Sequence, residues 1–153
     1  MRLTPHFTLK ELTVSQTATR LGLNNEPTEE HIENLTALCS EILEPLRMML
    51  GKPVIVTSGY RCHHLNALIG GSPTSQHKLG EAADIWVPGM STEDLMGVIC
   101  ESFDHDQVID EFGRWVHISF VAKYRSDKFN RREALRAIRS HGTTKYQPLF
   151  QGE

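Results

Sequence analysis

The feature that most constrains the fold of this chain is a pair of short segments in which apolar and polar side chains alternate. They cover residues 83–87 and 115–120. A period of two is typical of strands that pack one face against a core. On the other face, the first segment carries Asp84 and the second carries His117. The sequence therefore predicts two strands, each with one packed face and one face that presents a polar side chain.

A second histidine, His77, lies close to Asp84 in the stretch SQHKLGEAAD, residues 75–84. Gly80 disfavours a helix between them, so we expect the two side chains to meet through a loop that enters a strand. Two histidines and one carboxylate are the ligand set of an open zinc site, in which one position remains for water. Singly, each is more often a solvated side chain, so the prediction of one Zn²⁺ at His77, Asp84 and His117 depends on their combination.

The same residues resemble a known family. The pattern S-x-H-x-x-G-x-A-x-D at 75–84, followed by W-V-H-I-S at 115–119, is similar to the zinc D-alanyl-D-alanine carboxypeptidases of peptidase family M15. That family includes phage L-alanyl-D-glutamate endopeptidases and resembles the zinc domain of hedgehog signalling proteins. The resemblance covers about residues 4–122. Three upstream groups also fit its pattern, namely Ser58-Gly59-Tyr60-Arg61, Leu65-Asn66 and Gly70-Gly71-Ser72.

The resemblance implies a zinc-dependent peptidoglycan hydrolase that cleaves an amide bond in stem peptides or cross-links. The activity would be that of a D,D- or L,D-type carboxypeptidase or endopeptidase. The first six residues lack the apolar run of a secretory signal, and no segment approaches the ~20 apolar residues of a membrane span. We therefore expect a monomeric phage or prophage endolysin, made in the cytoplasm and acting on the cell wall after release.

Hydrolysis of an amide also needs a general base for the water and an acid for the leaving amine. Family members commonly place this carboxylate three residues before the last histidine, where this chain has Arg114. The nearest acids are Glu111 and Asp110. If residues 112–114 turn a hairpin, Glu111 lies across from the strand that carries His117. We predict Glu111 as the catalytic carboxylate and keep Asp110 as the alternative; a salt bridge from Glu111 to Arg114 would be a purely structural role.

Arg61 is predicted as a further catalytic residue, and Ser75, Gln76 and Trp115 are predicted to bind substrate. Arg61 matches the family's arginine that faces a substrate carbonyl or carboxylate, a task that suits the planar donor fork of a guanidinium. Ser75 and Gln76 precede the first predicted ligand and could donate hydrogen bonds to the substrate backbone. Alternatively, Ser75 caps the turn that presents His77. Trp115, on the ligand-bearing face of its strand, is predicted to form a cleft wall, although a tryptophan there is more often part of the core.

Two rival functions stay open at this point. One is a zinc-containing module that binds the cell wall or builds a virion without hydrolysis, and Arg114 in place of the usual acid favours it. The other is a cytoplasmic D-alanyl-D-alanine dipeptidase. Such an enzyme would need a closed pocket with a clamp for a free amine, and the sequence offers no evident clamp.

Length and charge agree with a small enzyme. A chain of 153 residues is expected to form a single zinc peptidase domain over residues 1–153. The formal net charge of −3 gives no indication of a nucleic-acid partner. Residues 123–153 form a C-terminal tail, and the stretch 122–141 is locally basic. That stretch is expected to be a solvated amphipathic helix or, alternatively, a surface attracted to an anionic cell wall or outer membrane.

The remaining pattern predicts the scaffold. A capping box at Thr8 and Glu11 predicts a short helix from about Leu9. Apolar residues spaced by three and four predict a helix over 28–50, kinked at Pro45. Further elements are expected as a strand at 53–57, helices at 62–69 and after Ser91, and two hairpin strands at 107–111 and 114–121. Helices first and an antiparallel sheet afterwards indicate the α+β class.

Overall fold

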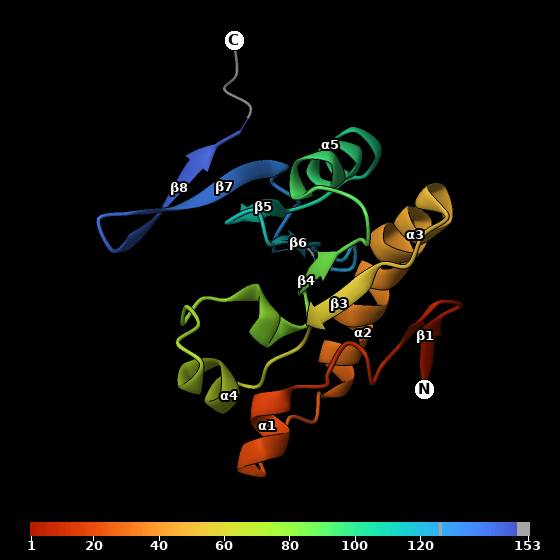
Figure 1. Cartoon of the computed structure of the whole chain (residues 1–153). Coiled ribbons are helices and arrows are strands. Elements are labelled where there is room, and N and C mark those ends of the chain that lie inside the picture. The colour runs from red at the N-terminus through yellow and green to blue at the C-terminus, as the bar shows by residue number, and fades with distance from the viewer. Residues whose placement is uncertain (126, 150–153) are drawn as a thin grey trace.

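The computed structural model describes residues 1–125 and 127–149, which form a six-stranded sheet, a two-stranded ribbon and helices packed around them (Figure 1). The strands are β1 (Arg2–Thr4), β2 (Phe7–Thr8), β3 (Ile55–Ser58), β4 (Ala82–Trp86), β5 (Gln107–Glu111), β6 (Trp115–Ser119), β7 (Glu133–Ser140) and β8 (Thr143–Pro148). The helices are α1 (Gln16–Leu21), α2 (Glu29–Leu38), α3 (Glu44–Leu50), α4 (His63–Leu68) and α5 (Thr92–Ser102), with a π-helical segment η1 (Cys39–Leu43) and a 3-10 turn η2 (Gln76–Leu79). This arrangement confirms the α+β class.

The main sheet has the order β3-β4-β6-β5-β7-β8. Its pairs are antiparallel except for β5 and β7, which run parallel. The predicted strands pair antiparallel as expected, and the one parallel pair involves β7, for which a helix had been expected. The parallel pair has a topological reason: β6 is already flanked by β4 and β5, so the chain that leaves β6 must add to a free edge of the sheet, and it adds to that of β5. After the connection 120–132, it arrives there in the direction of β5.

The two faces of the central strands differ sharply in chemistry. Asp84 on β4 lies opposite His117 on β6, and His117 lies opposite Ile109 on β5. These side chains therefore share one face. The other face carries fully buried apolar side chains that join the core with residues of α2, α3 and α5. On these three strands they are Ala83, Ile85, Val108, Val116 and Ile118. In Figure 1, α2 and α3 lie on one side of the sheet and α4 lies on the other.

The predicted helix over 28–50 exists but is interrupted. Thr28 caps α2 by accepting from the backbone N–H of His31. In η1 the backbone N–H of Glu44 donates to the carbonyl of Cys39, five residues earlier. Pro45, which follows, has no N–H to donate and its ring would clash with a carbonyl in the preceding turn. The π-helical widening accommodates the proline, so the predicted kink is realised as a change of helix type.

The short helix predicted near Leu9 is wrong. Both capping-box hydrogen bonds between Thr8 and Glu11 are present, but the segment forms only turns before α1 begins. The carbonyl of Leu12 explains why: it accepts from the backbone N–H of Tyr60 at 2.7 Å instead of serving a further helical turn. A tertiary contact therefore outweighs the local helix signal.

The helix expected over 122–141 is also wrong, because residues 133–140 form β7 and pair with β5. Glu, Ala, Leu and Arg, which dominate this strand, are good helix formers. The free edge of β5 nevertheless offers a row of unpaired backbone groups, and pairing with β7 satisfies them, while β8 pairs with the other edge of β7. Figure 1 shows the resulting β7–β8 hairpin extending away from the body. Among the described residues, no helix is long and apolar enough to cross a membrane.

Candidate metal centre and cleft

Three side chains that are distant in the sequence converge at the middle of the sheet. His77 comes from η2, Asp84 from β4 and His117 from β6, and one potential ligand atom of each lies within 4.8 Å of the others. The Asp84 Oδ1 atom is 3.3 Å from His77 Nε2 and 3.2 Å from His117 Nδ1. The register pair of β4 and β6 places Asp84 and His117 directly opposite each other.

His77 is held by backbone groups on both sides. Its ring Nδ1 lies 2.7 Å from the carbonyl oxygen of Gly59, and its own carbonyl accepts from the N–H of Arg61. A Cβ atom at Gly59 would come within 2.2 Å of the Leu12 carbonyl oxygen, so only glycine fits there. The turn is capped by Ser75, whose hydroxyl accepts from the backbone N–H of His77. The end of β3 thus fixes the orientation of the imidazole.

This arrangement suits a metal ion. A carbonyl oxygen can only accept, so the Nδ1 atom of His77 carries the proton and Nε2 presents a lone pair. Burial lowers the pKa of His77, which keeps the ring neutral. Burial alone would raise the pKa of Asp84, but positive charge at the positions of His77 and His117 holds that pKa well below its usual range. With His77 neutral, a cation bound between the side chains would supply this charge. Lone pairs of a neutral imidazole and a carboxylate that face one another require a cation between them, so the donor set fits Zn²⁺.

The three side chains line a cleft of about 820 Å³. Glu111 lines the same cleft, because its register partner Trp115 lies on the face that carries His117. Burial raises the pKa of Glu111, and the negative charges of Asp84 and Asp110 add to this effect while His117 opposes it. A half-buried carboxylate therefore shares one cavity with the candidate metal ligands.

Asp110, the alternative catalytic carboxylate, lies on the opposite face of β5, beside Val116. One of its oxygens accepts from the backbone N–H of Gly113, and the other lies 3.9 Å from Arg136. Asp110 therefore stabilises the β5–β6 turn and does not face the cleft. Arg114 is exposed in that turn and forms no ion pair with Glu111 in the part of the chain that the structure describes.

The predicted substrate-binding residues also line the cleft. Arg61 donates to the hydroxyl of Ser75, and its buried Nε atom has no hydrogen-bond partner among the described residues. Burial lowers the pKa of Arg61, while the charge of Asp84 opposes this. The side-chain amide of Gln76 is bonded to Asp106, and Trp115 is half-buried in the wall. Ser75 caps the turn, as its alternative role required, and still faces the cleft.

The sequence reasoning missed part of the cleft wall, which comes from beyond β6. Loop residues Lys128, Phe129 and Arg131 line the cleft together with Leu135 of β7 and Tyr146 of β8. It also missed Asp106, which is buried and binds Arg131 through both carboxylate oxygens. No spacing signal connects these residues, since the parallel pairing of β7 with β5 brings them together.

The comparison with known families agrees with this geometry. The chain matches the family Peptidase M15 over residues 5–119, three quarters of its length, and therefore belongs to this family of metallopeptidases. No curated protein matches the chain. All three converging side chains lie inside the matched region, whereas the loop after β6 and the β7–β8 hairpin lie outside it.

Proposed function

We propose that this protein is a zinc-dependent peptidoglycan hydrolase that cleaves an amide bond in stem peptides or their cross-links. The observation that carries the proposal is the convergence of His77, Asp84 and His117 in a cleft that also contains Glu111. Membership of the Peptidase M15 family supports a peptidase, and the resemblance of the site motif to enzymes of the bacterial cell wall supports the substrate class.

The metal would be held by His77 Nε2, an Asp84 carboxylate oxygen and His117 Nδ1. Bound there, zinc would supply Lewis-acid chemistry, which makes water more acidic and polarises a carbonyl group. The hydrogen bond from His77 Nδ1 to the carbonyl of Gly59 would keep that ring in the tautomer that binds metal.

Glu111 would act as the general base and then as the general acid. Its carboxylate would take a proton from the attacking water and deliver it to the nitrogen of the leaving amine. Partial burial favours this role, because a carboxylate with a raised pKa is a stronger base than a solvated one. The usual position of the catalytic acid is occupied by Arg114. Glu111 would replace that acid from β5, across from the strand that carries His117.

Arg61 would bind the carbonyl or carboxylate of the substrate. Its guanidinium lines the cleft, and among the described residues Nη2 donates to Ser75 while Nη1 has no hydrogen-bond partner, so Nη1 could donate to a substrate oxygen. The hydroxyl of Ser75 restrains the same guanidinium. Trp115 would form the wall beside the scissile bond and exclude part of the water.

The wider biological role rests on the resemblance. We propose a monomeric phage or prophage endolysin that reaches peptidoglycan after release from the cell. An open cleft of about 820 Å³ suits a peptide that is part of a larger polymer better than a free dipeptide, which disfavours a dedicated dipeptidase. The surviving rival is a zinc module without hydrolytic activity, because Arg114 replaces the usual acid.

Mass spectrometry of digested cell-wall sacculi tests the proposal. We expect the zinc-loaded wild type to convert one kind of amide bond into a free amine and a free carboxyl group, and muropeptides prepared from the treated sacculi show which bond that is. Removal of zinc with a chelator should stop this cleavage, and added Zn²⁺ should restore it. Unchanged muropeptides after treatment with a fully zinc-loaded protein would instead favour the non-catalytic module.

A further inference from the structure

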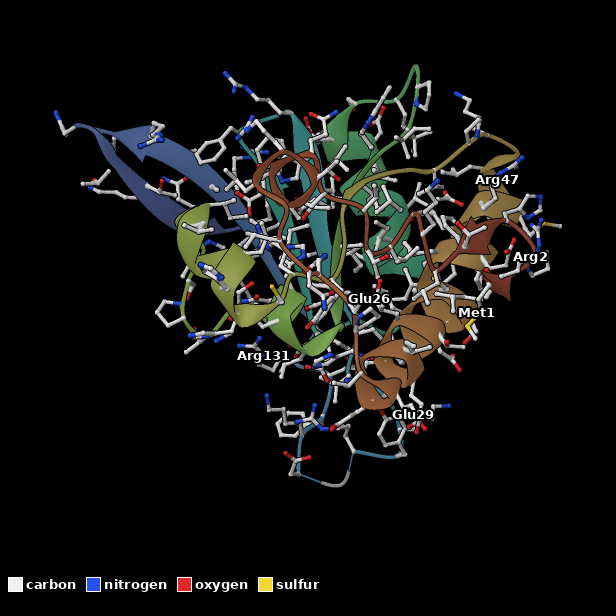
Figure 2. The ribbon with its side chains drawn as sticks, turned by 90° about the horizontal axis from the view of Figure 1, so that it is seen from below. Met1, Arg2, Glu26, Glu29, Arg47 and Arg131 are labelled. Atoms are coloured by element: carbon white, nitrogen blue, oxygen red, sulfur yellow. The ribbon has the colours of Figure 1, made fainter. Side chains whose placement is uncertain are left out.

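A chain of hydrogen bonds connects the loop after β6 to the residue before the first candidate ligand. Asp106, which is 3% exposed, accepts from Arg131 through Nε and Nη2, each at 2.9 Å, and through the backbone N–H. Its Oδ2 also accepts from Gln76 Nε2 at 2.6 Å. Arg131 lies outside the region matched to the family, two residues before β7 begins, and is labelled in Figure 2.

This chain of contacts determines which way the amide of Gln76 points. Asp106 is bound by a guanidinium in a bidentate pair, so it is a carboxylate that can only accept hydrogen bonds. The amide nitrogen of Gln76, and not its oxygen, must therefore face Asp106. The amide oxygen is then turned away from Asp106, and within the described residues it accepts no hydrogen bond. Gln76 lines the cleft, so its side chain offers a hydrogen-bond acceptor to a substrate, whereas the sequence had led us to expect a donor.

We infer that Gln76 is a substrate-binding residue whose side-chain carbonyl accepts a hydrogen bond from a backbone N–H of the substrate peptide. Asp106 and Arg131 are positioning residues that hold the amide in this orientation. An extended peptide in the cleft presents alternating N–H and C=O groups, so Arg61 as a donor and Gln76 as an acceptor match complementary groups of one substrate strand. This inference rests on the proposed function and states which partner donates and which accepts in the contact between Gln76 and the substrate.

Steady-state kinetics on soluble cross-linked muropeptides test the inference. Gln76→Met keeps the length of the side chain and removes the acceptor. In Asp106→Asn, Arg131 would retain the oxygen of the new amide, so its NH₂ group would face Gln76 and reverse that side chain. Each variant should raise KM about tenfold with little change in kcat, since the contact is made equally before and during the reaction.

The double variant separates positioning from a general structural effect. If Asp106 acts through Gln76, adding Asp106→Asn to Gln76→Met should raise KM no further. The inference would be overturned if the increases in KM of the two single variants multiplied in the double variant. It would also be overturned if KM were unchanged in Gln76→Met while the wild type is active. Either result would leave the proposed function intact. A wild type that does not hydrolyse muropeptides would overturn both. Thermal unfolding of each variant provides the folding control.

Discussion

The two faces of strands β4, β5 and β6 share one backbone and differ in almost everything else. One face carries buried apolar side chains that pack against helices, and the other carries Asp84, His117 and Glu111 toward the cleft. Neighbouring residues such as His117 and Ile118 therefore serve different purposes. The pleat allows a rigid core to position a polar site, so substitutions on the two faces should affect different measurements.

The largest effect is expected from the cleft face. His117→Ala removes one of the three candidate ligands, and hydrolysis of muropeptides should fall to background because no open zinc site remains. The zinc content of the purified protein should fall in parallel. His64→Ala on the exposed surface of α4 is the matched control and should retain activity and zinc. Equal activity of the two variants would show that the cleft face has no such role.

The next effect separates two adjacent carboxylates that point to opposite faces of β5. Glu111→Gln should lower kcat by about 100-fold to 10,000-fold, the usual contribution of a general base, while zinc stays bound. Asp110→Asn is the control, because Asp110 faces away from the cleft and caps the turn. A larger loss of kcat in Asp110→Asn than in Glu111→Gln would reverse the assignment.

Substitutions on the core face should lower the stability of the protein and leave zinc binding unchanged. Ile118 is fully buried, so Ile118→Ala leaves a cavity in the core and should lower the free energy of unfolding by about 2–5 kcal/mol. The fraction that remains folded should bind zinc as the wild type does. Chemical denaturation, with zinc content measured below the transition, checks both expectations. Loss of zinc from folded Ile118→Ala would mean that the two faces are not independent.

The smallest effect concerns Glu81, a buried acid just before β4. Burial raises the pKa of Glu81, although Arg125 opposes it through a 2.7 Å ion pair. The folded state therefore holds this proton more tightly than the unfolded chain does. The resulting stabilisation is fully present below the ordinary pKa of 4.5 and is lost as the pH rises through the folded pKa.

Glu81→Gln removes this titration, so its melting temperature relative to the wild type should rise as the pH is raised from 4 to 8. Melting curves of the two proteins in matched buffers without added metal give the comparison. A difference that stays constant over this pH range would contradict the assignment of a raised pKa to Glu81.

The central strands could be predicted from the sequence because their alternation is a local signal. The period of two at residues 83–87 and 115–120 placed Asp84 and His117 on one face, and the structure brings them together with His77. The helix expected after Ser91 is likewise present as α5, and Ser91 caps it by accepting from the backbone N–H of Asp94. Whether the three side chains bind zinc stays a prediction.

The rest of the cleft depended on interactions that no local pattern records. Residues 133–140 have helix-forming composition, and only the free edge of β5 makes them a strand. The contact of Asp106 with Arg131 follows from that pairing, since the sequence offers no spacing rule for residues that meet across a parallel pair. Gln76 was predicted to bind substrate. Whether its side chain donates or accepts a hydrogen bond there depends on Asp106 and could not be predicted.

The most direct test of the account is a crystal structure of zinc-loaded protein with anomalous data collected at the zinc absorption edge. We predict one strong peak, about 2.0–2.2 Å from His77 Nε2, an Asp84 carboxylate oxygen and His117 Nδ1. A zinc peak at another place, or none among these three side chains in crystals grown with excess zinc, would contradict the account.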